Sequence, residues 1–381
     1  MQILICYSFT CAAFFLVAFI AFFNPARVNI AANRWFGVFL FSIGCMLLNA
    51  IIYQFGDAAK YSALIAINEL SRFAMAPSLY LSVFYFTSPD KAFHKTDYLH
   101  FIPFALFFFF TVPGLFGLSS HGHHNEQDVI GHILAQLVFL SVKIQLIVYW
   151  VLSYYKLNRH QKNIRLINST TKPINLNWLN LVLIGIVCMI FLWFNELSFK
   201  IRFLSAFAPY GYVIGILFIC YYLLAQKEIY PFEDAELEDI TAVINSEVKV
   251  KEIKQRLADG ELNAIKNRLV FLMDEEKIYL DNELNLPQLA KRLAVSSHDL
   301  SYALNRGFNK NFFEFVNAYR VAEAKKLMLS DKYKHLNILG IAYSSGFNSK
   351  TTFNISFKKE THLSPTQFIQ QFKAGAESQI T

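Results

Sequence analysis

Charged residues and cysteines are both scarce in this chain of 381 residues. Aspartate, glutamate, lysine and arginine make up 17% of the sequence, whereas globular proteins average about 25%. Together with 39 phenylalanines, this shortage excludes a disordered or collagen-like chain and argues against an ordinary soluble enzyme. Five cysteines are too few for a disulfide scaffold.

The few charges are distributed unevenly along the chain. Residues 1–225 carry 14 basic and 7 acidic side chains, whereas residues 226–381 carry 21 of each. Within the second part, the net charge is −7 over residues 226–285 and +7 over residues 286–381. The sequence therefore predicts four parts: a membrane block at 1–225, an acidic and largely helical connector at 226–283, a basic domain at 284–370 and a polar tail at 371–381.

The first 225 residues contain apolar stretches long enough to cross a bilayer, which takes about 20 residues in a helix. We expect an all-α fold with a bundle of about seven such spans. The first is interpreted as a retained span rather than a signal peptide, because no basic residue precedes Arg27. The predicted spans are 3–23, 35–55, 64–86, 99–118, 131–155, 177–195 and 203–225.

Basic residues gather in alternate loops between these predicted spans. With the N-terminus outside, the inner loops hold nine basic residues and the outer loops hold three. Because basic residues favour the cytoplasmic side of a membrane, this count predicts that the C-terminal part is cytoplasmic.

The third predicted span contains two ionisable residues, Glu69 and Arg72, three apart on one helical face. They could pair with each other near a membrane surface, or line a pocket that receives a signal, because ionisable groups within spans usually serve a function. The His121–His124 run is interpreted as a solvated loop, and the cysteines, all in spans, as packing residues. No metal site, catalytic residue or cofactor is predicted.

The connector contains a helical pattern at 247–279, with apolar residues three or four positions apart and a glycine at Gly260. Such a helix could pair with its copy in a homodimer, or it could pack on the terminal domain. The acidic connector is also a plausible place for proteolytic release of that domain.

Two similar helical units occupy residues 284–370. In the first, Asn285 and Gln288 are spaced like a helix N-cap and its partner, and in the second a turn is predicted at Gly346. A helix, a short turn and a second helix with polar exposed positions are typical of a helix-turn-helix, whose second helix enters the major groove of DNA. The two second helices and the long helix between the units are predicted at 297–305, 349–360 and 312–329.

These units resemble the DNA-binding domain of AraC/XylS-type transcription regulators. The resemblance rests on "LNLPQLAKRLAVSSHDLSYALN", "NFFEFVNAYRVAEAKKLM" and "LNILGIAYSSGFNSKTTFNISFKKETHLSPTQF". It implies two recognition helices that enter successive major-groove segments on one face of double-stranded DNA. The "MAPSLYLSVFYF" and "LHFIPF" runs are similar to seven-span regions of membrane-bound AraC-type regulators in Bacteroidetes-like bacteria.

The candidate DNA-binding residues follow from the helical pattern and from this resemblance. On the first recognition helix no lysine or arginine occupies a base-facing position, whereas Lys358 and Lys359 end the second and are placed to meet phosphate. A packing role for His298 and a solvated face for the two lysines are the alternatives. The candidates are Ser297, His298, Ser301, Tyr302, Asn305, Ser349, Lys350, Thr351, Thr352, Asn354, Ile355, Lys358 and Lys359.

The sequence thus predicts a non-enzymatic, sequence-specific transcription regulator embedded in the bacterial inner membrane. It would couple a small-molecule or membrane signal to promoter binding, with DNA, membrane lipid, a second copy of the chain and RNA polymerase as candidate partners. The alternative is a transporter or channel-like protein that carries a fused regulatory DNA-binding domain. An intramembrane enzyme has no supporting motif.

Overall fold

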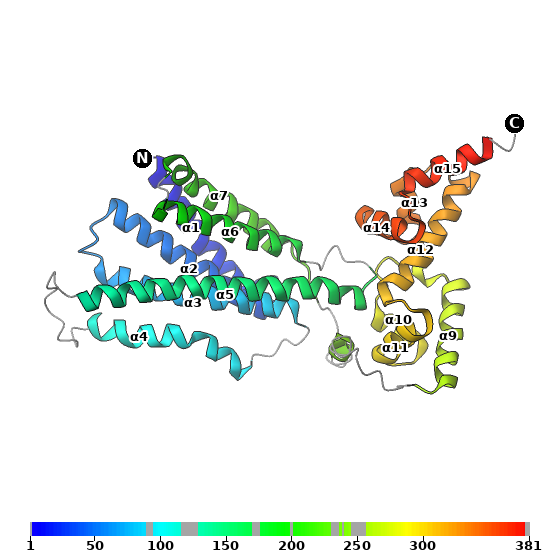
Figure 1. Ribbon diagram of the computed structural model, residues 1–381, viewed down its shortest axis with the longest axis horizontal. Helices are drawn as coiled ribbons and strands as arrows, with labels where there is room; N and C mark the ends of the chain where they lie inside the picture. Colours follow the sequence, from blue (N-terminus) through cyan, green and yellow to red (C-terminus); the bar gives the residue numbers. More distant parts are fainter. Residues whose placement is uncertain are drawn as a thin grey trace. The chain divides into compact units, whose positions relative to one another are not determined.

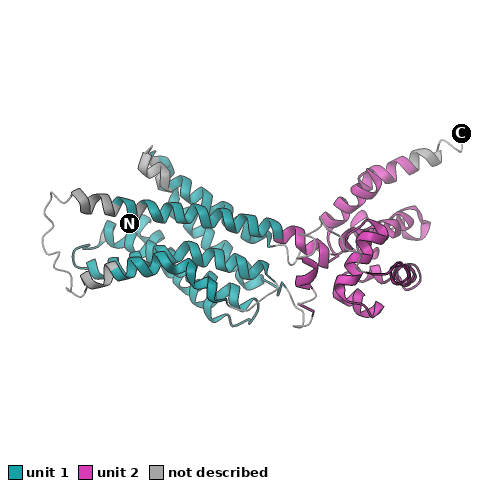
Figure 2. Cartoon of the chain, turned by 60° about the horizontal axis from the view of Figure 1, so that its bottom comes forward, with its two compact units in different colours: residues 1–159, 176–229 teal, residues 160–175, 230–381 magenta. Residues whose placement is uncertain are grey.

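The computed structural model is helical wherever it describes regular structure, so the predicted all-α class is confirmed. One isolated antiparallel bridge, between Asn168 and Asn285, is present among the described residues. The chain divides into two compact units, residues 1–159 with 176–229 and residues 160–175 with 230–381 (Figure 2). The described residues are 2–88, 94–115, 129–169, 176–198, 201–229, 236–237, 240–244 and 257–377.

Unit 1 contains a helix at each of the seven ranges predicted to span a membrane (Figure 1). Neighbouring helices pack side by side, α1 on α2 and α7, α2 on α3, α3 on α4, and α6 on α7. The His121–His124 run lies outside the described residues. The elements are α1 (Gln2–Phe23), α2 (Ile30–Phe55), α3 (Ser62–Thr87), η1 (Lys95–Phe101), α4 (Ile102–Leu115), α5 (Val129–Ile167), α6 (Asn177–Ser198) and α7 (Arg202–Ala225).

Three described helices are long and apolar enough to cross a membrane. They contain the stretches Ile3–Phe23, Ile30–Gln54 and Ala206–Ala225, and α6 adds a shorter apolar stretch, Asn177–Leu192. Helix α4 has 14 residues, fewer than a span requires. The polar residues around the Glu69–Arg72 ion pair lower the mean hydropathy of helix α3. Three spans are therefore supported by the described helices, and seven stays a prediction.

The surface of unit 1 is apolar while part of its interior is polar. Leu16, Ile214 and Leu224 are each more than 60% exposed, whereas Asn33 and Asn49 are 1% exposed. Large exposed apolar surfaces are uncommon on soluble monomers and mark contacts with lipid or protein. This distribution suits helices whose outer faces meet hydrocarbon and whose polar groups are satisfied internally.

Unit 2 contains the two predicted helical units, joined by the long helix α12. Its apolar core brings α12, α13, α14 and α15 together through Val321, Ile341, Phe353, Phe357 and Phe368. The elements are α9 (Asp259–Asp274), η2 (Ile278–Leu280), α10 (Leu286–Leu293), α11 (Ser297–Phe308), α12 (Phe312–Leu329), η3 (Asp331–Tyr333), α13 (Ile338–Ser344), α14 (Lys350–Thr361) and α15 (Pro365–Glu377).

Serine or asparagine side chains begin helices α10 to α15 of this unit. The predicted cap of α10 forms in both directions: Asn285 Oδ1 accepts from the Gln288 amide at 3.0 Å, and Gln288 Oε1 accepts from the Asn285 amide at 3.2 Å. Ser364 and Gln367 form the same reciprocal pair at the start of α15. These caps fix where each helix begins, and thereby which of its side chains face outward.

A buried arginine of α12 joins the two helical units. Arg320 is 0% exposed, and its Nε and Nη2 donate to the carbonyl oxygens of Tyr279 and Asp281, both at 2.7 Å. Its guanidinium lies 5.8 Å from the ring centroid of Phe347, in the turn of the second unit. Gly346 in that turn has φ +90°, and a Cβ there would lie 2.4 Å from the Tyr279 oxygen, so glycine is required by both conformation and space.

Candidate nucleic-acid interface

Helix α9 packs on the first helical unit, against α10 and α11. Its Ile265, Leu269 and Met273 are buried, and the Lys266 ammonium lies 5.6 Å from the ring centroid of Phe308. Of the two roles left open for the connector helix, packing on the terminal domain is the one observed. Residues 247–256 of the predicted helix lie outside the described part of the chain.

Helix α11 presents most of its candidate DNA-binding residues at the surface. Leu300, Ala303 and Leu304 are fully buried, which turns His298, Ser301 and Tyr302 to a half-buried outer face and exposes Asn305. Ser297 differs from the prediction, because it is 3% exposed at the first position of the helix.

An arginine on the same helix was not among the residues predicted from the sequence. Arg306 is exposed and lies four residues after Tyr302, on the same side of α11. The i, i+4 spacing from Tyr302 was the signal that could have identified it.

Of the eight candidates at the cap and along helix α14, six are exposed and two are buried. Ser349 is 1% exposed because its Oγ accepts from the Thr352 amide at 3.3 Å and caps the helix, and Thr352 is 5% exposed beside Phe353. Both side chains are therefore buried, whereas the prediction placed them on the outer face. The exposed candidates are Lys350, Thr351, Asn354, Ile355, Lys358 and Lys359.

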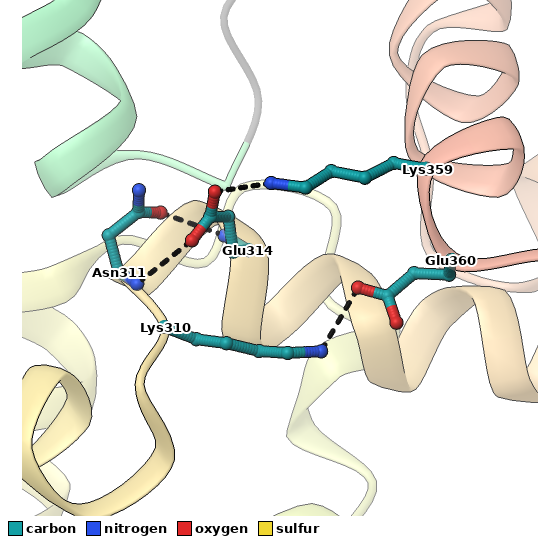
Figure 3. Close-up of polar contacts among 5 residues, drawn as sticks. All are labelled: Lys310, Asn311, Glu314, Lys359 and Glu360. Carbon is teal, nitrogen blue, oxygen red and sulfur yellow. Dashed lines mark hydrogen bonds and ion pairs between the residues drawn. The ribbon is translucent and has the colours of Figure 1, made fainter.

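One of the exposed candidates, Lys359, forms an ion pair. Its Nζ donates to Glu314 Oε1, and Lys310 Nζ donates to Glu360 Oε1 at 3.0 Å (Figure 3). Glu314 also accepts from the amide of Asn311 at its second oxygen. The two crossed pairs tie the start of α12 to the end of α14, so Lys359 helps to position α14.

The Glu69–Arg72 pair forms a second candidate site, within unit 1. Arg72 Nε lies 2.8 Å from Glu69 Oε2, and Asn49 Nδ2 donates to Glu69 Oε1 at 2.9 Å. Asn68 Nδ2 donates to Asn49 Oδ1 at 2.9 Å, which extends the network between α2 and α3. The predicted pairing is therefore present. Glu69 also borders a pocket of about 350 Å³ lined by Tyr53, Ala58, Ser62, Ile65, Ala66 and Phe107.

The described residues offer no metal site of three or more histidine, cysteine, aspartate or glutamate side chains. Comparison with protein families finds a match in the C-terminal part of the chain. Residues 289–371 match the family described as a helix-turn-helix domain. This part of the chain is a helix-turn-helix domain of the AraC type. Such regulators are not enzymes, in line with the prediction from the sequence.

Part of the chain is also similar to part of several whole proteins. Among its relatives are uncharacterised HTH-type transcriptional regulators of Staphylococcus aureus strains COL, MSSA476 and N315, each 29% identical over 106 residues. That match covers 28% of this chain and 14% of each relative. A solved structure of a Listeria innocua protein of unknown function is 24% identical over 28% of this chain and 94% of that one, with a TM-score of 0.24.

The ion pair at Glu314 makes the stability of the helix-turn-helix domain depend on pH. Burial alone would raise the pKa of the Glu314 carboxyl, but hydrogen bonds from Lys359 and from the Asn311 amide lower it below its usual 4.5. A carboxyl with a lowered folded-state pKa stabilises the fold above its unfolded pKa and loses that contribution as the pH falls. Glu314→Gln should therefore lower the free energy of unfolding at pH 7 and have a smaller effect at pH 3.

Denaturant unfolding of the helix-turn-helix domain within the full-length protein, at the two pH values, measures this difference. Lys359→Ala is the matched variant, because Glu314→Gln should cost less in its background. An effect of Glu314→Gln that is equal at pH 7 and pH 3 would contradict the assignment.

Proposed function

We propose that this protein is a membrane-embedded transcription regulator that couples a signal at or in the membrane to sequence-specific binding of promoter DNA. The observation that carries the proposal is the pair of helices α11 and α14, whose polar outer faces belong to one domain held together by α12. The net charge of +7 over residues 286–381 supports contact with phosphate. A second copy of the chain and RNA polymerase are further candidate partners.

The exposed residues of α14 divide by chemistry into base and phosphate contacts. Lys350, Thr351 and Asn354 carry hydrogen-bonding groups suited to base edges in the major groove, and Ile355, 57% exposed, suits the methyl group of thymine. Lys358, at the end of the helix, is assigned to a phosphate. On α11 the base contacts are assigned to His298, Ser301, Tyr302 and Asn305, with Arg306 beyond them.

Selection of binding sites from random DNA by the full-length protein, at two salt concentrations, tests this function. We expect a motif of two blocks about one helical turn apart. Ile355→Ala and Thr351→Ala should each relax one block, by about 1–3 kcal/mol at the affected base pair. Lys358→Ala should weaken binding to all sequences and reduce the salt dependence by about one phosphate contact.

Lys326→Ala is the matched control, because Lys326 is a 74% exposed lysine of α12 outside both recognition helices. It should leave the motif unchanged. Salt-sensitive binding without any enriched motif would overturn sequence-specific regulation. A motif that Ile355→Ala and Thr351→Ala both leave intact would overturn the role of α14.

The proposed topology has seven spans, with the N-terminus outside. Residues 160–169 belong to the same compact unit as the helix-turn-helix domain, which supports placing both on the cytoplasmic side. If α7 were the one crossing between residue 169 and the domain, the two would lie on opposite sides of the membrane. A second crossing is therefore needed in this interval, and α6, with its apolar stretch Asn177–Leu192, supplies it.

Cysteine labelling distinguishes this topology from one with three spans. Lys60→Cys, in the predicted outer loop, should react with a membrane-impermeant thiol reagent in intact cells. Lys162→Cys, which is exposed on α5, should react only after the membrane is permeabilised. With spans at α1, α2 and α7 alone, both positions would be outside and both would react in intact cells.

The pocket at Glu69 is the proposed signal site. A volume of about 350 Å³ suits a small molecule. The pocket lining is mostly apolar, with the Glu69 carboxylate and the hydroxyls of Ser62 and Tyr53 as its polar groups. We therefore propose a largely apolar ligand that bears a hydrogen-bond donor.

Glu69→Gln keeps the shape of the side chain but removes its charge. Promoter occupancy, measured by chromatin immunoprecipitation across growth conditions, should vary in the wild type and stay constant in Glu69→Gln. Lys60→Gln is the control, since Lys60 is exposed and does not line the pocket. Occupancy that follows the wild type in every condition would remove Glu69 from the signal site.

A further inference from the structure

The last turns of α5 belong to a different compact unit from the rest of that helix. Residues 129–159 belong to unit 1, whereas His160 to Ile167 belong to unit 2, together with the helix-turn-helix domain (Figure 2). His160, Ile164 and Ile167 are each no more than 1% exposed, with a spacing of three or four that gives one buried helical face. This segment is thus a built part of the DNA-binding unit although it lies between two predicted spans.

Ser169, directly after α5, is fully buried and fully hydrogen-bonded. Its Oγ donates to the carbonyl oxygen of Leu284 at 2.6 Å and accepts from Arg320 Nη2 at 3.1 Å. Its carbonyl oxygen accepts from Asn317 Nδ2 at 3.2 Å. The neighbouring Asn168 forms the antiparallel bridge with Asn285, the residue that caps α10.

These contacts reach the residue that joins the two helix-turn-helix units. Arg320 binds the backbone just before the first unit, at Tyr279 and Asp281, and lies against Phe347 in the turn of the second. Ser169 accepts from Nη2 of that guanidinium, which also donates to Asp281. A displacement of Ser169 would leave one buried N–H of a charged group without its acceptor, which is costly in a protein interior.

We propose that residues 160–169 are the docking segment through which α5 controls the DNA-binding domain, and that docking of Ser169 on Arg320 favours the arrangement that binds DNA. The receptor surface consists of Arg320, Asn317 and the Leu284–Asn285 edge. Because α5 is one continuous helix, a shift or rotation of its membrane part would be transmitted to Ser169. The proposal rests on the proposed function and names its route of regulation, which differs from relay through the connector.

A disulfide cross-link tests whether the docking exists in the full-length protein in lipid nanodiscs. Residues opposite one another in an antiparallel bridge have Cα atoms about 4.5–5.5 Å apart, within disulfide range. Asn168→Cys combined with Asn285→Cys should therefore form a disulfide on mild oxidation, identified by mass spectrometry. The two single variants control for the native cysteines. Absence of the disulfide, when both thiols can be labelled, would overturn the proposal.

DNA affinity of the same full-length protein tests the consequence of docking. Ser169→Ala should weaken binding to the selected site about tenfold, the scale of one hydrogen bond to a charged group. The salt dependence should not change, because no phosphate contact is lost. Ser153→Ala is the matched control: Ser153 is also fully buried on α5, but its Oγ donates to the Tyr149 carbonyl of its own helix.

The following results would decide against the docking or against the proposed function. Ser169→Ala with wild-type affinity, or Ser153→Ala with an equal loss, would remove the docking contact from DNA binding. A cross-linked protein that binds at least tenfold more weakly than its reduced form would show that docking opposes DNA binding, contrary to the proposed direction. Wild-type protein that selects no motif would overturn the proposed function itself, and is thus distinguishable from failure of the docking alone.

Discussion

The guanidinium of Arg320 is the constraint on which the rest of the DNA-binding unit depends. Burial lowers its pKa to about 9, so it is still charged at neutral pH, and a buried charge is tolerated only with its hydrogen bonds satisfied. Its four acceptors are neutral: the backbone carbonyls of Tyr279 and Asp281, Oδ1 of Asn317 at 3.3 Å and the Ser169 hydroxyl. Because these acceptors come from separate parts of the chain, satisfying one guanidinium fixes the approach to the first helix-turn-helix unit, the long helix and the loop after α5 together.

That constraint also explains features of the second unit. Gly346 leaves space for the Tyr279 carbonyl and Arg320 Nε, which a Cβ would approach to 2.4 and 3.1 Å. Phe347 then covers the guanidinium and begins the aromatic series through Phe353, Phe357 and Phe368, with successive ring centroids 5.2–5.4 Å apart. The contact of Phe347 with the Arg320 guanidinium and the packing of the aromatic rings together determine which face of α14 is buried, and therefore which face points outward. The ion pairs at Glu314 and Glu360 add a further tie at the helix end.

Local signals in the sequence predicted most of this domain. The cap at Asn285, the helix at 312–329 and the turn at Gly346 are as expected, because caps, apolar periodicity and glycine act over a few residues. The sequence predicts Ser349 and Thr352 on the outer face, but Ser349 caps the helix and Thr352 is buried beside Phe353. The Ser169–Arg320 contact joins residues 151 positions apart and has no periodic signal. In the membrane block, composition predicted the helices but could not count the spans.

The contacts within unit 1 connect the proposed signal site to α5. Glu69 and Phe73 lie one turn apart on α3, and the Phe73 carbonyl accepts from Gln145 Nε2 on α5 at 3.3 Å. Spatial continuity alone does not establish coupling, which needs an element with two arrangements that both sites influence. Helix α5 is the candidate element, since residues 129–159 belong to unit 1 and its end carries the proposed docking segment. A ligand at Glu69 would therefore act by favouring one position of α5, and Ser169 would carry that preference to Arg320.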